Sequence, residues 1–361
     1  ISSRPRAHPA TPRIAPTTAP PTAPPPPPPP DQRPAGQERT RSRRPPRSPD
    51  HQKVAAPLGL DPDQIVALTG IRTRYWVEQG QASSDLAVVA GQRACEAAGI
   101  TPQSVDAILV STTSPDSAFP STACHVQRAL GANPVMAFDL SASCSGFLYG
   151  VSMADVMIRS GQVRSCLVIA AEVKSRSLDA RDRETAMLFG DGAGAVLVVQ
   201  EDSAQPDAPG ILGVRLYADG SGHGLITIPA GGSRKPVGVD TVRASEHMLR
   251  MQGRAVFRSA VRRLEQAMID VLKEFGLAAG DVTRVIAHQA NARILEQLRR
   301  RLGLSQEAVY SVIEQYGNTS SASLPIALDQ AVRTQRLAAG DLVLLGAFGG
   351  GLTWATGLVR W

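Results

Sequence analysis

Long apolar runs are absent from this sequence. Nowhere do 18 consecutive apolar residues occur, so no segment is predicted to span a membrane. The first residues also lack the apolar block of a secretory signal. Cysteine is scarce, and its four copies, Cys95, Cys124, Cys144 and Cys166, form no CxxC pair. This argues against a disulfide framework or a zinc site, and together these absences predict a cytoplasmic protein.

The basic excess of the sequence is confined to its first 50 residues. They hold 17 of the 28 prolines and nine arginines, but only three acidic residues. The rest of the chain carries 29 basic and 29 acidic side chains. The net charge of +6 is therefore no evidence that the globular part binds nucleic acid, and nucleic acid is not an expected partner.

Residues 1–56 are predicted to form a disordered or polyproline-like tail. Prolines 24–30 are unbroken, and the segment has almost no large apolar side chains to offset the entropy lost on ordering. Two explanations stay open. The tail is a docking arm for an acidic partner or a Pro-binding domain, or it is a spacer or a mis-assigned start, since GC-rich DNA read out of frame often encodes Pro and Arg.

From residue 57 onward, short apolar runs alternate with amphipathic stretches. The runs are typical of strands buried on both faces, and they lie at 107–111, 166–170, 194–199, 284–287 and 342–346. An apolar stripe over 254–275 predicts a helix that Gly276 can cap. Two sets of strands interleaved with helices predict an α/β fold of two similar halves, 57–203 and 204–361.

Among the four cysteines, Cys144 is the candidate nucleophile. It lies in a turn of small residues after an apolar strand end, and 146–159 has the pattern of a helix that begins there. A helix N-terminus offers free N–H groups and the positive end of the macrodipole, which favour the reactive thiolate. The other three cysteines are predicted to be inert.

Two further segments carry polar groups that suit thioester chemistry. His288 directly follows the strand 284–287, and Asn318 lies in a small-residue loop that opens a helix at 324–332. Alone, such residues are more often a core histidine or a turn former. Together with Cys144 they supply a nucleophile and two hydrogen-bond donors for a carbonyl oxygen, which thioester condensation needs.

Seven motifs occur in a fixed order: TGIR at 69–72, AFPS at 118–121, the Cys144 turn, FGDGAG at 189–194, HQAN at 288–291, GNTS at 317–320 and FGGG at 348–351. With these motifs the sequence resembles the β-ketoacyl-acyl carrier protein synthase III family over residues 65–361. The resemblance implies a thiolase-like fold with layers α-β-α-β-α and no metal or redox cofactor. FGDGAG lacks the spacing of a phosphate-binding loop and is interpreted as a structural turn.

The resemblance also implies a reaction. Cys144 takes a starter acyl group from a thioester, and His288 and Asn318 hold the thioester carbonyl of malonyl-acyl carrier protein while carbon dioxide departs. The resulting carbanion attacks acyl-Cys144 and gives a β-ketoacyl thioester. The backbone N–H groups of Cys144 and Gly350 form the oxyanion hole.

Substrate and partner contacts follow from the same resemblance. It implies coenzyme A contacts at Arg183, Gly253, Phe257 and Asn291, and a homodimer in which Phe119 bounds the acyl pocket of the partner. A basic surface for the acidic acyl carrier protein is predicted from Arg258, Arg293, Arg299, Arg300 and Arg301.

The sequence departs from the family in two places. The family often sandwiches the adenine of coenzyme A between a Trp and an Arg, where this chain has Gln64 and Leu68. We therefore expect weaker acyl-CoA binding or a starter carried by a protein. The family also opens with a strand that we take to be central in the first sheet, and the Pro/Arg tail stands in its place. Because a missing central strand costs more than a domain's net stability, we expect poor solubility or activity unless it is restored.

Several functions stay open. The first is a condensing enzyme that starts fatty-acid or polyketide chains, and it is favoured because decarboxylation needs both His288 and Asn318. The second is an acyltransferase of secondary metabolism that works without decarboxylation. A truncated inactive homologue and a non-catalytic docking protein, whose purpose is the Pro-rich arm, are the others.

Overall fold

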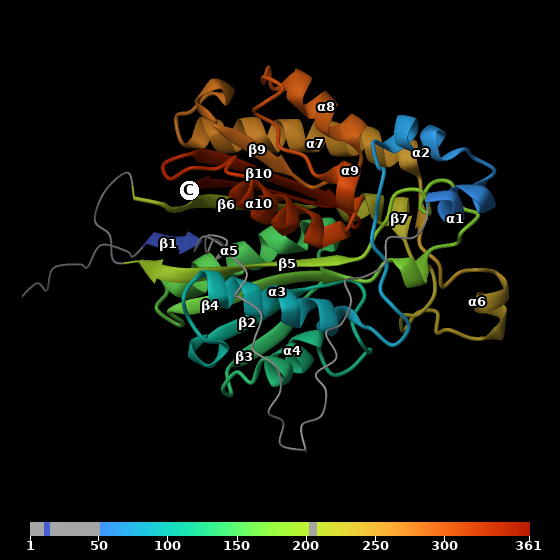
Figure 1. Ribbon diagram of the computed structural model, residues 1–361, viewed down its shortest axis with the longest axis horizontal. Helices are drawn as coiled ribbons and strands as arrows, with labels where there is room; N and C mark the ends of the chain where they lie inside the picture. The colour runs from blue at the N-terminus through green and yellow to red at the C-terminus, as the bar shows by residue number, and fades with distance from the viewer. Residues whose placement is uncertain (1–10, 15–50, 202–207) are drawn as a thin grey trace, which may run out of the picture.

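The computed structural model describes residues 11–14, 51–201 and 208–361. Two sheets are stacked between layers of helix (Figure 1). The first has the order β1-β5-β4-β2-β3, with strands β1 (Thr11–Ile14), β2 (Ala107–Ser111), β3 (Met136–Leu140), β4 (Ser165–Glu172) and β5 (Gly192–Glu201). The second has the order β6-β11-β10-β9, with β6 (Gly210–Ala218), β9 (Arg284–Ala287), β10 (Leu342–Gly349) and β11 (Thr353–Arg360). A short ribbon pairs β7 (Ile226–Thr227) with β8 (Arg250–Met251).

Helices fill the space between the sheets and cover both outer faces. The middle layer is α5 (Gly146–Arg159) and α10 (Ser323–Arg333), whose buried side chains share one core with strands of both sheets. The first sheet is covered by α3 (Ser83–Ala97) and α4 (Thr122–Leu130), and the second by α7 (Gly253–Glu274) and α8 (Ala292–Arg301). The predicted α-β-α-β-α layering is thereby confirmed.

Four shorter helices complete the described chain. They are α1 (His51–Ala55), α2 (Pro62–Thr69), α6 (Val239–Arg243) and α9 (Ile313–Tyr316). Of these, α1, α2 and α6 lie at one end of the stacked sheets (Figure 1). In the part of the chain that the structure describes, no helix has the length and apolarity needed to cross a membrane.

The apolar runs in the sequence are strands, as predicted, because both of their faces are covered. Every residue of β4 and of β10 is buried. β2 pairs in parallel with β3 and β4, and β9 pairs in parallel with β10. The chain therefore leaves β3, β4, β9 and β10 near one end of the stack, and this end carries the candidate site.

The N-terminal segment differs from the prediction in two respects. Four of its residues form β1, which pairs antiparallel with β5 at the edge of the sheet and buries Ile14. The centre of this sheet is built from β4 and β2, so the opening strand supplies one hydrogen-bonded ladder and not two. In addition, α1 begins at His51, inside the predicted tail.

The other parts of the tail prediction, residues 1–10 and 15–50, lie outside the described residues, as does the proposed boundary between the two halves at 203/204. The expected poor solubility stays a prediction. The premise of that prediction was a missing central strand, and it is weaker now. The structure has a first strand of four residues, and this strand lies at the edge of the sheet.

Candidate active site

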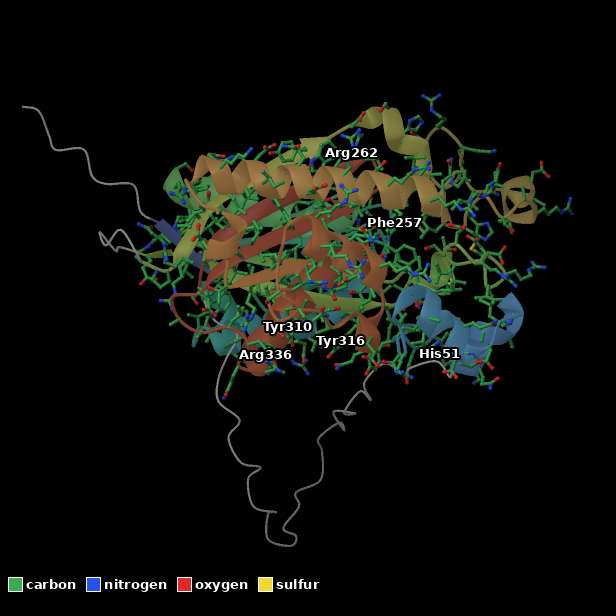
Figure 2. All side chains as sticks on the ribbon, turned by 90° about the horizontal axis from the view of Figure 1, so that it is seen from above. His51, Phe257, Arg262, Tyr310, Tyr316 and Arg336 are labelled. Carbon is green, nitrogen blue, oxygen red and sulfur yellow. The ribbon has the colours of Figure 1, made fainter. Side chains whose placement is uncertain are left out.

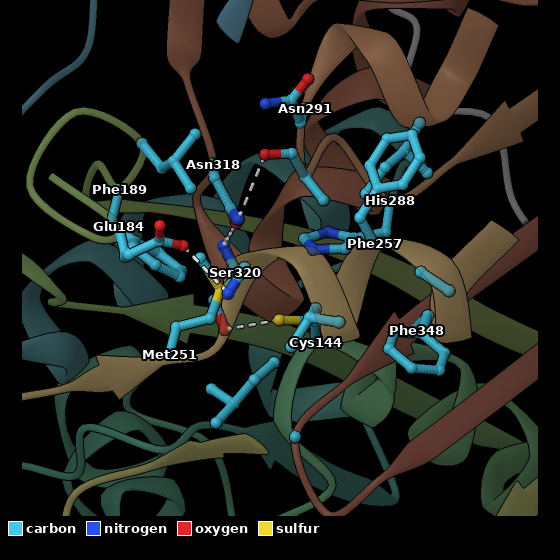
Figure 3. Close-up of a pocket in the computed structure, with 18 of the residues that line it drawn as sticks. Cys144, Glu184, Phe189, Met251, Phe257, His288, Asn291, Asn318, Ser320 and Phe348 are labelled. Carbon is cyan, nitrogen blue, oxygen red and sulfur yellow. Dashed lines mark hydrogen bonds between the residues drawn. The ribbon is translucent and has the colours of Figure 1, made fainter. Parts of the chain in front are cut away.

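Cys144 lies in a tight turn that leads directly into α5. The turn is a 3-10 helix, Ser143–Ser145, and Ser143 has a φ of 48°. The end of β10 packs closely on it: a Cβ on Gly349 would lie 2.6 Å from the backbone nitrogen of Cys144. Only a glycine permits this approach without displacing backbone. The Cys144 side chain lines a cavity of about 700 Å³ (Figure 3).

The thiol of Cys144 is buried, and burial decides its protonation. Desolvation, with a smaller contribution from the charge of Glu172, raises the pKa of Cys144 to about 11. The contact with Ser320 Oγ, 3.5 Å from Sγ, and the charge of Lys174 lower the pKa but do not compensate. Burial thus opposes the thiolate that the helix N-terminus is predicted to favour, and the protonation state of Cys144 stays a prediction.

His288 follows β9 and faces the same cavity. Its backbone N–H donates to the carbonyl of Gly346, 2.7 Å away, which fixes the residue beside β10. Its Nδ1 lies 2.5 Å from Ser323 Oγ, and that oxygen also accepts from the N–H of Gln289 at 3.1 Å. When the Ser323 hydroxyl donates its hydrogen to Nδ1, Nε2 carries the ring proton.

Burial also keeps His288 uncharged. It lowers the pKa of the imidazole to about 4, against a smaller opposing effect of Glu172. A neutral ring with its proton on Nε2 is a hydrogen-bond donor toward the cavity. This is the group that an oxygen with growing negative charge requires.

Asn318 is held by the Gly-rich turn that we interpreted as structural. Its N–H donates to Leu188 O and its carbonyl accepts from the N–H of Gly190, both at 3.0 Å. The side-chain Oδ1 accepts from the N–H of Ser320 at 2.9 Å. This bond orients the amide: Nδ2 donates one N–H to Ala290 O at 3.5 Å and keeps a second N–H (Figure 3).

Gly350, the second residue of the predicted oxyanion hole, lies beside the nucleophile turn. It lines the cavity with Cys144, and a Cβ on it would lie 3.1 Å from Ser143 Oγ. Gly350 therefore packs against the turn that carries Cys144. No polar side chain is needed at either position.

Three of the four predicted coenzyme A contacts line the cavity, and the fourth does not. Gly253, Phe257 and Asn291 line the mouth of the cavity, with Phe257 projecting from α7 (Figure 2). Arg183 does not occur among the described residues that line it: its Nε and Nη2 donate to Leu58 O at 3.0 and 2.7 Å. Phe119 is also outside the cavity and is 87% exposed.

A carboxylate stands at this mouth, which the sequence did not indicate. Glu184 Oε2 accepts from the N–H of Gly253 at 2.9 Å and so caps the N-terminus of α7. Gln64 is used in a similar way: its Oε1 accepts from the N–H of Asp61 at 2.8 Å and caps α2. Leu68 borders the cavity and is 37% exposed. Where the family often has a Trp and an Arg, this chain thus has a glutamine that caps a helix and an apolar leucine.

The predicted basic surface divides into two parts. Arg258 and Arg293 line the cavity mouth, together with Arg254, which sequence reasoning missed. The arginines at the end of α8 are neutralised by acidic neighbours. Arg299 and Arg300 pair with Glu296, and Arg301 pairs with Glu265 at 2.6 Å.

Comparison with known proteins identifies the chain's relatives. Family models described as 3-oxoacyl-[acyl-carrier-protein] synthase III match residues 138–220 and, for its C-terminal part, 272–361. A β-ketoacyl-[acyl-carrier-protein] synthase III of Erythrobacter litoralis is 46% identical over 311 residues, which is 86% of this chain and 94% of that protein.

Solved structures agree. The 3-oxoacyl-[acyl-carrier-protein] synthase III of Aquifex aeolicus has a TM-score of 0.77 at 39% identity, over 86% of this chain and 94% of that one. The priming β-ketosynthase of the R1128 polyketide pathway has a TM-score of 0.80 at 35% identity, over 88% and 92%. The chain belongs to the β-ketoacyl-acyl carrier protein synthase III family, thiolase-fold acyltransferases whose condensation reaction starts fatty-acid or polyketide chains.

Proposed function

We propose that Cys144, His288 and Asn318 carry out this condensation between a starter acyl thioester and malonyl-acyl carrier protein. One observation carries the proposal: the three side chains come from three separate segments and line one cavity. A thiol, a neutral imidazole and an oriented amide are the groups that the two half-reactions need.

In the first half-reaction, Cys144 Sγ bonds to the carbonyl carbon of the starter thioester. The carbon–sulfur bond of that thioester breaks, and the departing thiolate takes the proton that the Cys144 thiol loses. The N–H groups of Cys144 and Gly350 stabilise the tetrahedral oxyanion. The product is an acyl group on Cys144.

In the second half-reaction, the malonyl group loses carbon dioxide and the electron pair of the broken bond forms an enolate. Nε2 of His288 and Nδ2 of Asn318 donate to the enolate oxygen, which carries the growing charge. The carbanion then attacks the acyl carbon. Collapse of the tetrahedral intermediate expels the Cys144 thiolate, which takes a proton from solvent, and the β-ketoacyl thioester leaves.

Variants of the full chain test this division of labour. Cys144→Ala should abolish condensation and leave decarboxylation of malonyl-acyl carrier protein measurable. His288→Ala should allow Cys144 to become acylated and should stop release of carbon dioxide. Acyl transfer to an acceptor without release of carbon dioxide would support the non-decarboxylating acyltransferase, and no reaction at Cys144 would support a docking protein.

The partners are part of the same proposal. Acyl carrier protein docks beside the mouth at Arg258 and Arg293, where its acidic surface meets arginines that form no ion pair within the described part of the chain. The starter arrives on coenzyme A or on a carrier protein, and Gln64 and Leu68 favour the latter because neither supplies the aromatic or arginine side chain that the family often places against adenine. The enzyme works in the cytoplasm as a homodimer with Phe119 in the interface.

A further inference from the structure

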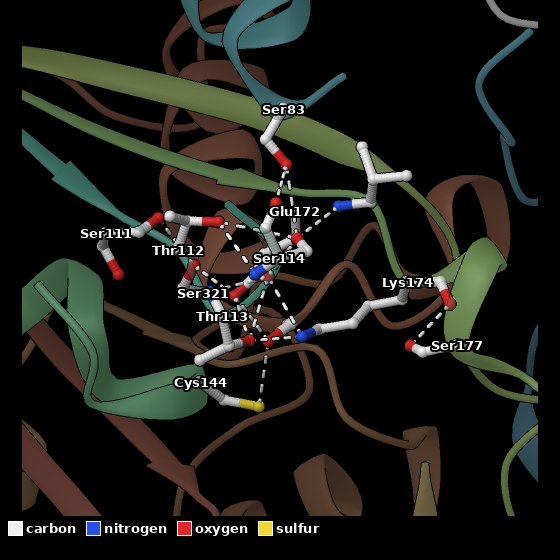
Figure 4. Close-up of polar contacts among 12 residues, drawn as sticks. Ser83, Ser111, Thr112, Thr113, Ser114, Cys144, Glu172, Lys174, Ser177 and Ser321 are labelled. Atoms are coloured by element: carbon white, nitrogen blue, oxygen red, sulfur yellow. Dashed lines mark hydrogen bonds and ion pairs between the residues drawn. The ribbon is translucent and has the colours of Figure 1, made fainter. Parts of the chain in front are cut away.

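The wall of the cavity beside Cys144 contains an ion pair that the reaction does not use. Glu172 ends β4 and is fully buried, and Lys174 follows two residues later with a side chain that is 7% exposed. Lys174 Nζ lies 3.1 Å from Glu172 Oε2 (Figure 4). A buried pair of charges is expensive to maintain, so its presence in a substrate cavity calls for a role.

Both carboxylate oxygens of Glu172 accept several hydrogen bonds. Its Oε1 accepts from the hydroxyls of Ser320 and Ser321 at 3.0 Å, and its Oε2 accepts from the Ser114 hydroxyl at 3.0 Å. Both oxygens are also within reach of the Thr113 hydroxyl. An ionised carboxylate accepts hydrogen bonds and donates none. Glu172 is therefore fixed as the negative partner and offers nothing to a substrate.

Lys174 is different, because one of its N–H groups has no partner within the described chain. Its ammonium has three N–H groups. Within the described chain, Glu172 Oε2 and Thr113 Oγ1 are its partners. Lys174 and Thr113 both line the cavity. The third N–H is thus available to a group that enters the cavity.

This donor is close to the reacting sulfur. Cys144 Sγ lies 3.5 Å from Ser320 Oγ, which lies 3.0 Å from Glu172 Oε1, and Glu172 bonds Lys174 (Figure 4). Because Cys144 and Lys174 line the same cavity, an acyl group on Sγ shares that cavity with the ammonium of Lys174. A plain alkyl chain would cover the free N–H of Lys174 and leave it without a partner, which is costly in a buried place.

The sign of the charge limits the ligand further. The positive charge of Lys174 is already balanced by Glu172, so a second carboxylate would add an uncompensated negative charge close to Glu172. A neutral oxygen satisfies the N–H without this penalty. We propose that Lys174 selects starter acyl groups that carry a neutral hydrogen-bond acceptor, a hydroxyl or carbonyl oxygen near the thioester, over plain alkyl groups of equal length.

The inference rests on the proposed acylation of Cys144, and one experiment addresses both. Pantetheine thioesters of butyrate, 3-hydroxybutyrate and succinate share the same leaving group and have four-carbon acyl chains. The full chain is mixed with each, and acyl-Cys144 is followed by mass spectrometry of the intact protein. We expect 3-hydroxybutyryl to react about tenfold faster than butyryl, as one ordinary hydrogen bond predicts, and succinyl to react slowest.

Variants test whether Lys174 is responsible. Glu172→Gln with Lys174→Met removes both charges without leaving one unpaired, and should abolish the preference for 3-hydroxybutyryl. Lys174→Arg keeps donors and should retain it. The matched control makes the same exchange in a surface pair, Glu246→Gln with Lys235→Met, whose atoms lie 2.6 Å apart, and should leave the ratio unchanged.

The outcomes are separable. If no thioester acylates Cys144, the proposed function fails along with this inference. If acylation occurs but butyryl reacts as fast as 3-hydroxybutyryl in the wild type, only the inference is overturned. The inference is also overturned if succinyl reacts fastest, because the site would then select a negatively charged acyl group.

Discussion

Hydrogen-bond partners decide what each reactive side chain presents to a substrate. His288 offers Nε2–H because Ser323 occupies Nδ1, and Asn318 offers Nδ2 because the N–H of Ser320 occupies Oδ1. Ser323 is not among the described residues that line the cavity, whereas the hydroxyl of Ser320 also lies 3.5 Å from Cys144 Sγ. Both are positioning residues, and each acts by removing the alternative orientation of its neighbour.

Replacing Ser323 by Ala should therefore change the tautomer of His288. Without a donor at Nδ1, the ring proton is shared between the two nitrogens, and the donor at Nε2 is partly lost. We expect release of carbon dioxide to fall about tenfold, because one buried hydrogen bond is worth about 1 kcal/mol or slightly more, while acylation of Cys144 stays near the wild-type rate.

Nitrogen-15 NMR of His288 measures this directly. The wild type should show a protonated Nε2 and the Ser323→Ala variant a mixture of tautomers, and Ser323→Thr, which keeps a hydroxyl, should restore the first pattern. An unchanged spectrum in the alanine variant would remove Ser323 from the mechanism.

The reactivity of Cys144 toward a small alkylating reagent should depend steeply on pH. Burial raises its pKa to about 11, so the thiolate fraction should rise about tenfold per pH unit from about pH 6 to pH 10 without levelling off. Iodoacetamide labelling of the full chain, with Cys144→Ser as the blank, gives the profile. A plateau near pH 7 would mean that the thiolate is stabilised after all.

The sequence could suggest the three candidate residues, which line one cavity, but not the groups that orient them. Cys144, His288 and Asn318 stand at strand or helix boundaries that apolar patterning reveals. Glu172 contacts Ser320 and Ser321, which are 148 and 149 residues away in the sequence. No local sequence pattern predicts such contacts. The burial that raises the pKa of Cys144 was not predictable either, since burial is a property of the fold.

At the scale of elements, the site is made by strand ends and turns that fit closely. The turn after β3 places Cys144 against the end of β10, and the turn before β5 holds the backbone of Asn318. These contacts are between backbones, which have little freedom to yield. Small residues at such positions are therefore requirements of geometry.

Gly349→Ala tests this fit. The new methyl carbon would lie 2.6 Å from the backbone nitrogen of Cys144 and 3.0 Å from its Cβ, so either β10 or the nucleophile turn must move. We expect a loss of about 1–3 kcal/mol in the free energy of unfolding and a larger loss of Cys144 acylation than of overall fold. Circular dichroism with urea and the acylation assay measure the two.

Gly280→Ala is the matched control, because a Cβ there meets nothing within 4 Å and its φ is not positive. It should leave stability and acylation near the wild-type values. Equal acylation in both variants would show that the turn tolerates movement of β10.

Most elements were predictable from their residues, and β1 was not. The helix at 254–275 and the apolar strands appear where their patterns place them, to within a few residues, because propensity and burial agree there. The segment around β1 is rich in Pro and Arg, and its strand exists only because β5 offers an unpaired edge. A strand that depends on its partner in this way leaves no signal in its own composition.

At the scale of the whole molecule, one large apolar side chain projects away from the body of the protein. Phe119 is 87% exposed, more than any other large apolar residue that the structure describes. An exposed phenylalanine ring is costly in water, and burying it is worth about 2 kcal/mol per copy. In a symmetric dimer each ring is buried once, so the proposed homodimer gains from both.

Phe119→Asp should therefore dissociate the homodimer. The charge would have to be buried at the interface, which adds a desolvation penalty to the lost apolar contact. We expect light scattering to report a dimer for the wild type and mainly monomer for the variant at equal concentration. If Phe119 also bounds the acyl pocket of the partner, the monomer should lose its discrimination between short and long starter acyl groups, while Cys144 stays reactive toward iodoacetamide.

Val89, 48% exposed on α3, provides the comparison. A Val89→Asp variant that dissociates the dimer without changing chain-length preference would separate assembly from selectivity. A monomeric wild type would remove Phe119 from both roles.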